Sequence, residues 1–108
     1  MLLDIRATTR AMRLLLFLAG SQFDISRSAA DEGERSEAAS AAALLTPIVK
    51  SWCTDQGFRV ASLAVQVHGG AGYIEETGIA QRLRDVRIAP IYEAVSYTHL
   101  TLPTSDLV

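Results

Sequence analysis

The chain has 108 residues, of which 49% are apolar and 20% are charged, and its formal net charge is −2. This composition is ordinary for one globular domain or part of one, and the charge gives no electrostatic reason to expect nucleic acid as a partner. The single cysteine, Cys53, excludes an intramolecular disulfide and a multi-cysteine metal cluster. The longest apolar run, from Leu14 to Gly20, falls far short of the roughly 20 residues of a membrane helix. A cytoplasmic location without membrane insertion is therefore expected.

The first predicted helix runs from about Asp4 to Arg27, because apolar side chains recur at intervals of three, four or multiples of these. The recurring residues are Ile5, Met12, Leu16, Ala19 and Phe23. Further apolar residues between Leu14 and Leu18 widen the apolar surface beyond one stripe. This excess indicates either further helices of a bundle or a subunit interface.

A polar, acidic stretch from Ala30 to Ser36 is predicted to connect this helix to the next. Glu37–Leu45 is alanine-rich and favours helix, and Pro47 then either starts a new helix with Thr46 as its N-cap or kinks the existing one. The following helix is predicted from Pro47 to about Val67. Its inner stripe consists of Val49, Trp52, Gln56, Val60, Leu63 and Val67. Two long helices of similar length joined by a short loop predict an antiparallel hairpin and an all-α fold.

Glycines follow this helix at Gly69, Gly70 and Gly72. One or two glycines after a helix are typical of a simple terminator, which is the simplest interpretation of the first pair. A third is more than termination needs, and glycines also let a ligand approach backbone amides.

Thr77 is predicted to cap a short third helix in which Asp85 forms an ion pair with neighbouring arginines. Its apolar face consists of Ile79, Leu83 and Val86. Pro90 is predicted to end this helix and to hold Ala89 extended, as a stiff apolar approach to Glu93. A carboxylate in this position is often only a surface residue. An apolar setting, however, raises the pKa of a carboxylate, which suits a base that removes a proton from carbon.

Three motifs occur in a fixed order: Gln-x-x-Gly-Gly from Gln66 to Gly70, Arg-Asp-x-x-Ile from Arg84 to Ile88, and Ile-Tyr-Glu ending at Glu93. Their order and spacing resemble the C-terminal helical domain of the flavin-dependent acyl-CoA dehydrogenases. The resemblance extends more weakly back to about Leu3. It implies that residues 1–93 form an incomplete domain of this type, a partial up-down four-helix bundle.

The resemblance implies a fragment, inactive alone, of an FAD-dependent enzyme that catalyses α,β-dehydrogenation of acyl-CoA thioesters. Glu93 is implied as the catalytic base, and no metal site is implied. The segment implied to contact FAD consists of Gln66, Val67, His68, Gly69 and Gly70. The implied partners are an acyl-CoA substrate, electron-transferring flavoprotein as acceptor, and further copies of the chain. These copies would form a dimer or tetramer that shares FAD across subunits.

After Glu93 the sequence departs from the family, which continues with Gly-Thr, whereas this chain continues with Ala94 and Val95. Residues 94–108 are therefore predicted to be a non-native or disordered tail. Two alternatives remain open: an acyl-CoA oxidase-like flavoenzyme, and a helical interaction module without chemistry.

Overall fold

A computed structural model of the protein describes residues 1–92. Within this range the chain is helical and contains no strand. The elements are α1 (Leu2–Ser28), α2 (Glu32–His68), the single turn α3 (Gly70–Tyr73), the 3₁₀ turn η1 (Glu75–Thr77) and α4 (Ile79–Tyr92). The all-α fold, with a helical hairpin and a shorter helix after it, is confirmed.

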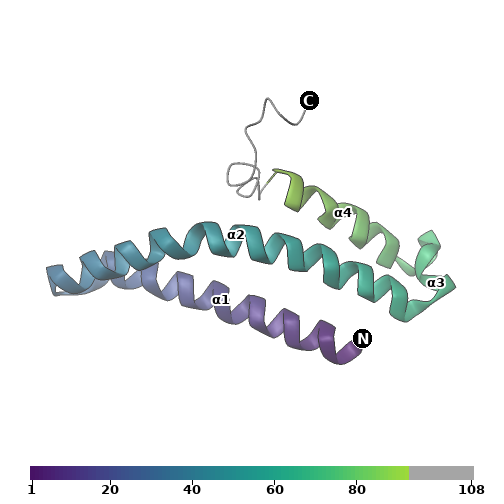
Figure 1. Ribbon diagram of the computed structural model, residues 1–108, viewed down its shortest axis with the longest axis horizontal. Helices are drawn as coiled ribbons and strands as arrows, with labels where there is room; N and C mark the ends of the chain where they lie inside the picture. Colours follow the sequence, from purple (N-terminus) through teal and green to yellow (C-terminus); the bar gives the residue numbers. More distant parts are fainter. Residues whose placement is uncertain (93–108) are drawn as a thin grey trace.

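The middle element of the fold is α2, which lies between α1 and α4 (Figure 1). The helix α1 runs antiparallel to α2 and packs along it, whereas α4 folds back along the C-terminal half of α2. The corner where the chain reverses is made by α3 and η1. None of the helices within residues 1–92 combines the length and the hydropathy that a bilayer-spanning helix needs.

The connection between α1 and α2 is shorter than the sequence predicts. It covers only residues 29–31, because Asp31 caps α2 by accepting a 3.0 Å hydrogen bond from the backbone N–H of Glu34. The guanidinium of Arg35 donates to the carbonyl of Ala29 at 2.7 Å and so closes the turn from the other side. An N-cap of this kind lets the acidic residues that follow Asp31 join the first turn of the helix.

The prediction that Pro47 starts a new helix is wrong, because α2 is one continuous helix of 37 residues against 27 in α1. The hydroxyl of Thr46 donates to the carbonyl of Ala42 at 2.8 Å, within the helix, instead of capping a new one. A proline in a helix interior costs about 3 kcal/mol and leaves the carbonyl four residues earlier without its donor. Here that carbonyl belongs to the exposed Ala43, where water can replace the missing N–H.

The seam between α1 and α2 is built from small side chains. The residues buried in it are Thr8, Ala19, Ala38 and Ala42, and no large side chain is fully buried within residues 1–92. Of the predicted first stripe, Ala19 is buried, but Leu16 stays 51% exposed, because α2 is the helix that packs along α1 within residues 1–92. Leu14 and Phe17 are 70% and 73% exposed, which confirms that the apolar surface of α1 extends beyond the seam.

A polar cluster joins the N-terminal end of α1 to α2. The guanidinium of Arg59 donates to both carboxylate oxygens of Asp4, at 2.9 and 3.0 Å, and at 2.8 Å to the hydroxyl of the buried Thr8. Its Nε donates at 2.7 Å to Gln56, which explains the polar break in the predicted stripe of α2. A forked arginine–carboxylate pair has a fixed geometry, so it sets the register of the hairpin.

We expect the Asp4→Asn substitution to lower the unfolding midpoint only slightly at neutral pH, since the pair is partly exposed, and by an amount that shrinks on acidification. The hydrogen bonds from Arg59 and Thr8 lower the pKa of Asp4 below its ordinary value of 3.8. Their contribution is therefore fully present above pH 3.8 and is lost as the pH falls through the folded-state pKa. Thermal unfolding of both proteins across this range measures the difference. A difference that stays constant with pH would contradict this role for the pair.

Candidate functional site

The Gln-x-x-Gly-Gly motif spans the end of α2 and the start of α3. Gln66, Val67 and His68 form the last turn of α2, and Gly69 and Gly70 follow it. Gly69 has a positive φ of 64°, which glycine adopts without the strain a side chain would cause, and its N–H donates to the carbonyl of Gln66 at 3.0 Å. All five residues are exposed, so the whole motif forms an outward-facing turn.

His68 is bound to its own helix. Its Nδ1 lies 2.8 Å from the carbonyl oxygen of Ala64, a distance at which a protonated Nδ1 donates a hydrogen bond. Residues 1–92 contain no group of three His, Cys, Asp or Glu side chains arranged to hold a metal ion. The contact with Ala64 therefore holds the His68 side chain against the last turn of α2.

The glycines after α2 differ in how closely other atoms approach them. A Cβ added at Gly72 would lie 2.5 Å from the carbonyl oxygen of Val65 and 2.9 Å from the Cβ of His68, so α3 packs directly on the backbone of α2. Cβ atoms added at Gly69 and Gly70 would meet no atom of residues 1–92 within 4 Å. Gly70 also lacks a positive φ. Neither packing nor backbone conformation within the chain therefore requires glycine at position 70.

A pair missed in the sequence joins the corner to α4. The guanidinium of Arg84 donates to both carboxylate oxygens of Glu75, at 2.8 and 2.9 Å. These bonds, and the attraction between the charges, lower the pKa of Glu75 and raise that of Arg84. The predicted ion pair of Asp85 with a neighbouring arginine is not found within residues 1–92, although the charge of Asp85 adds to the raised pKa of Arg84. The nine-residue separation of Glu75 and Arg84 offers no helical periodicity that would have revealed their pairing.

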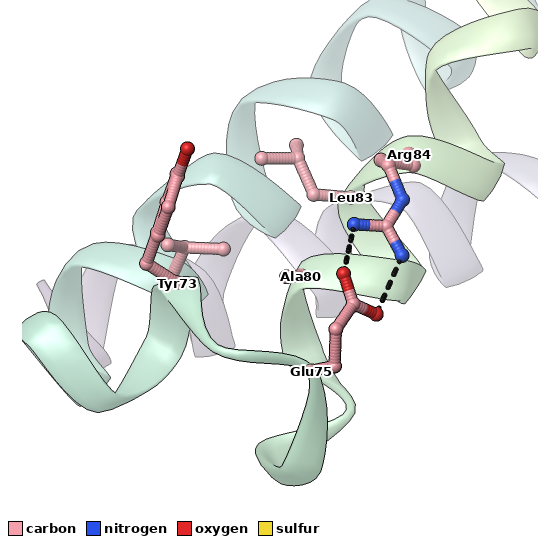
Figure 2. A pocket seen from close by; sticks show the side chains of 6 residues that line it. Tyr73, Glu75, Ala80, Leu83 and Arg84 are labelled. Carbon is pink, nitrogen blue, oxygen red and sulfur yellow. Dashed lines mark hydrogen bonds and ion pairs between the residues drawn. The ribbon is translucent and has the colours of Figure 1, made fainter.

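Beside this pair is a hollow of about 310 Å³ between the corner and α4. Figure 2 shows Tyr73 on one side of it and the Arg84–Glu75 pair on the other, with Ala80 and Leu83 between them. Val65 contributes the α2 side. Tyr73 is 83% exposed, so the hollow is open to solvent along its tyrosine side.

The helix α4 begins later and continues further than predicted. Gly78, with φ of 79°, ends η1, and its carbonyl accepts from the N–H of Arg82, so Thr77 does not cap α4. The predicted face of Ile79, Leu83 and Val86 is confirmed as half-buried.

The prediction that Pro90 ends the helix is wrong, since α4 includes Ala89 and Pro90 and reaches Tyr92. In this last described turn, Pro90 removes one N–H donor, and the helix tolerates this loss. The approach to Glu93 is therefore helical and not extended. Glu93 itself and the predicted tail of residues 94–108 lie outside the described residues.

Close contacts fix α4 on α2. A Cβ added at Gly57 would lie 3.6 Å from a methyl carbon of Val86, an ordinary van der Waals distance, so Gly57 faces Val86 of α4 directly. The guanidinium carbon of Arg87 lies 5.1 Å from the centre of the Phe58 ring, within the range of a cation–π contact. Both contacts lie in the C-terminal half of α2, about three helical turns before the glycine turn.

Comparisons with known proteins agree with this arrangement. Residues 1–101 match the family model described as acyl-CoA dehydrogenase, C-terminal domain. The chain is 49% identical over 96 residues to a 3-methylmercaptopropionyl-CoA dehydrogenase of Ruegeria pomeroyi, covering 89% of the chain and 16% of that relative. It is 33% identical over 97 residues to a butyryl-CoA dehydrogenase of Syntrophomonas wolfei, covering 90% of the chain and 16% of that relative.

A third relative is the caffeyl-CoA reductase-Etf complex subunit CarC of Acetobacterium woodii, 29% identical over 96 residues that cover 89% of the chain and 22% of that relative. No solved structure matches the chain. The chain thus spans less than a quarter of the length of each of these relatives. On the family match and these identities, the chain belongs to the acyl-CoA dehydrogenase family, within its C-terminal helical domain.

Proposed function

We propose that the chain is part of an FAD-dependent acyl-CoA dehydrogenase that catalyses the α,β-dehydrogenation of acyl-CoA thioesters in the cytoplasm, and that the chain alone is inactive. The observation that carries the proposal is the 49% identity to an acyl-CoA dehydrogenase over 89% of the chain. The exposed apolar side chains of α1, with Phe17 at 73%, support a need for further protein around the hairpin. In this proposal residues 1–93 form the family's domain; the family match itself continues to residue 101, so residues 102–108 lie beyond it.

The turn after α2 is the proposed contact with FAD bound mainly by a neighbouring subunit. Its five residues, Gln66, Val67, His68, Gly69 and Gly70, are all exposed. The space beside Gly69 and Gly70 is open, which fits close approach by the adenosine and pyrophosphate of a dinucleotide. When bound, FAD supplies the acceptor for the hydrogen and the electron pair removed from the β-carbon. The contribution of this chain is to bind and orient that group.

Glu93 is the proposed general base, on the strength of its place in the Ile-Tyr-Glu motif. Its carboxylate would accept the α-proton of the acyl thioester, and its backbone N–H would donate to the thioester carbonyl oxygen. This donor stabilises the negative charge that develops on that oxygen as the proton leaves. Glu93 comes directly after α4, which packs on α2 and is helical up to Tyr92.

The proposed electron acceptor is electron-transferring flavoprotein, and the proposed assembly is a homodimer or homotetramer. One relative is, by its name, a subunit of a reductase-Etf complex, which favours this acceptor over oxygen. The rival oxidase would consume oxygen when given acyl-CoA and no other acceptor. A helical interaction module without chemistry would bind no flavin at all.

The test is anaerobic addition of acyl-CoA to the full-length protein that contains this chain. We expect the protein to purify with flavin and the flavin absorbance to fall on addition of substrate. The chain of residues 1–108 purified alone should retain no flavin, because one exposed turn cannot offset the ~4–15 kcal/mol cost of association. A full-length protein without flavin, or with flavin that acyl-CoA leaves oxidised, would overturn the proposal.

A further inference from the structure

The corner between α2 and α4 is a short excursion of the chain, residues 70–77, which lies between two glycines. Gly69 and Gly78 both have positive φ, at 64° and 79°, and between them lie α3 and η1. The chain changes direction at each glycine, so residues 70–77 leave the axis of α2 and return to α4. The exposed turn proposed to meet FAD, Gln66–Gly70, leads directly into this excursion.

Most hydrogen bonds of the excursion are local. The N–H of Gly72 donates to the carbonyl of Gly69, that of Gly78 donates to the carbonyl of Glu75, and the Thr77 hydroxyl donates to the carbonyl of Ile74. These bonds shape the excursion but do not attach it to α2 or to α4.

Contacts near both of its ends attach it to the neighbouring helices. Near its start, Gly72 packs on the backbone of Val65 and so fixes α3 against α2. Near its end, the fork from Arg84 to Glu75 fixes η1 to α4 with two parallel hydrogen bonds (Figure 2). A planar guanidinium that binds both carboxylate oxygens fixes orientation as well as distance.

This fork contributes little to global stability. The side chains of Arg84 and Glu75 are 58% and 71% exposed, and exposed pairs add little to the free energy of unfolding. The fork instead affects the position of residues 70–77, which lie between α2 and α4. Position matters for a binding group, since a displacement of about 1 Å can cost a site up to 10²-fold in function.

Resting on the proposed FAD contact, we propose that Glu75 and Arg84 are positioning residues for that contact. Their fork holds the excursion on α4 and thereby sets where the Gly69–Gly70 turn meets the dinucleotide. Neither side chain needs to touch FAD for this role. Loss of the fork lets the turn move while α2 and α4 stay folded, so the affinity for FAD falls without a matching loss of stability.

The test uses the full-length holoenzyme with Glu75→Gln and, separately, Arg84→Lys. The first keeps the shape but removes the charge, and the second keeps the charge but removes the planar fork. The matched control is Asp4→Asn, which breaks a fork of the same kind between α1 and α2. Arg59 of that pair lies about 15 Å along α2 from Gly69 at 1.5 Å per residue. A fourth variant, Gly70→Val, places a side chain in the proposed contact itself.

The readouts are the rate of FAD release, followed by flavin fluorescence, and the unfolding midpoint. We expect Glu75→Gln and Arg84→Lys to release FAD about 3- to 30-fold faster with nearly unchanged midpoints, and Asp4→Asn to release it at the native rate. If Gly70→Val accelerates release but the fork variants do not, the positioning role is wrong and the FAD contact stands. If none of the turn and fork variants changes the rate, the proposed FAD contact is wrong as well. Equal acceleration by Asp4→Asn would show general destabilisation and would also overturn the positioning role.

Discussion

Replacing Glu93 by Gln in the full-length enzyme should slow anaerobic reduction of its flavin by acyl-CoA by about 10²- to 10⁴-fold, the usual contribution of a general base. The amide keeps the size of the side chain but cannot accept the α-proton. Binding of FAD and acyl-CoA should persist, because neither depends on the charge of a group that acts on the proton alone. The rate is followed by flavin absorbance in a single turnover.

The matched control for this experiment is Glu76→Gln. Glu76 lies in η1 and is exposed. Its substitution removes the same charge as Glu93→Gln, but at the corner of the fold. Its flavin should be reduced at the native rate. Reduction at the native rate in Glu93→Gln, or an equal loss in both variants, would show that Glu93 is not the base.

The second large effect is expected at Gly72. An alanine Cβ there would lie 2.5 Å from the backbone oxygen of Val65, closer than real Cβ contacts come, and a backbone atom cannot rotate away as a side chain does. Overpacking of this kind costs about 1–3 kcal/mol and would push α3 off the end of α2. The Gly72→Ala variant should therefore unfold at a lower temperature than the native protein.

Gly70→Ala is the matched control for Gly72→Ala, with the same atoms added two residues earlier. A Cβ at Gly70 meets nothing within 4 Å, and the residue has no positive φ, so the unfolding midpoint should stay the same or rise slightly. Equal destabilisation by both substitutions would contradict the distinction between a packing glycine and a glycine that faces open space.

Periodic apolar residues predict that α1, most of α2 and α4 are helical, although Leu16, Trp52 and Val67 of the predicted stripes are exposed. The half-buried face of Ile79, Leu83 and Val86 and the antiparallel hairpin both follow from that periodicity. The two errors at Pro47 and Pro90 have one cause. The local preference of proline against helix is a few kcal/mol, and helix-forming neighbours and packing on an adjacent helix outweigh it.

The contacts that hold the candidate site are not periodic, and this is why sequence reasoning missed them. Gly72 meets Val65, and Glu75 meets Arg84, only because the chain reverses direction at Gly69 and Gly78. The backbone angles of those two glycines set which residues face each other, and their identity alone does not reveal the angles. The motif of Gln66 to Gly70 was found by resemblance, and its exposure is a finding of the structure.

The turn from Gln66 to Gly70 is proposed to lie against the adenosine side of FAD. The most direct measurement is photolabelling of the full-length oligomer with FAD that carries an azide on its adenine, followed by identification of the labelled peptide. Label is expected on the peptide that contains Gln66–Gly70, and none on the connection between α1 and α2, where Ala30 and Asp31 are exposed. Label confined to peptides outside residues 66–78, at full occupancy of the flavin, would contradict this placement.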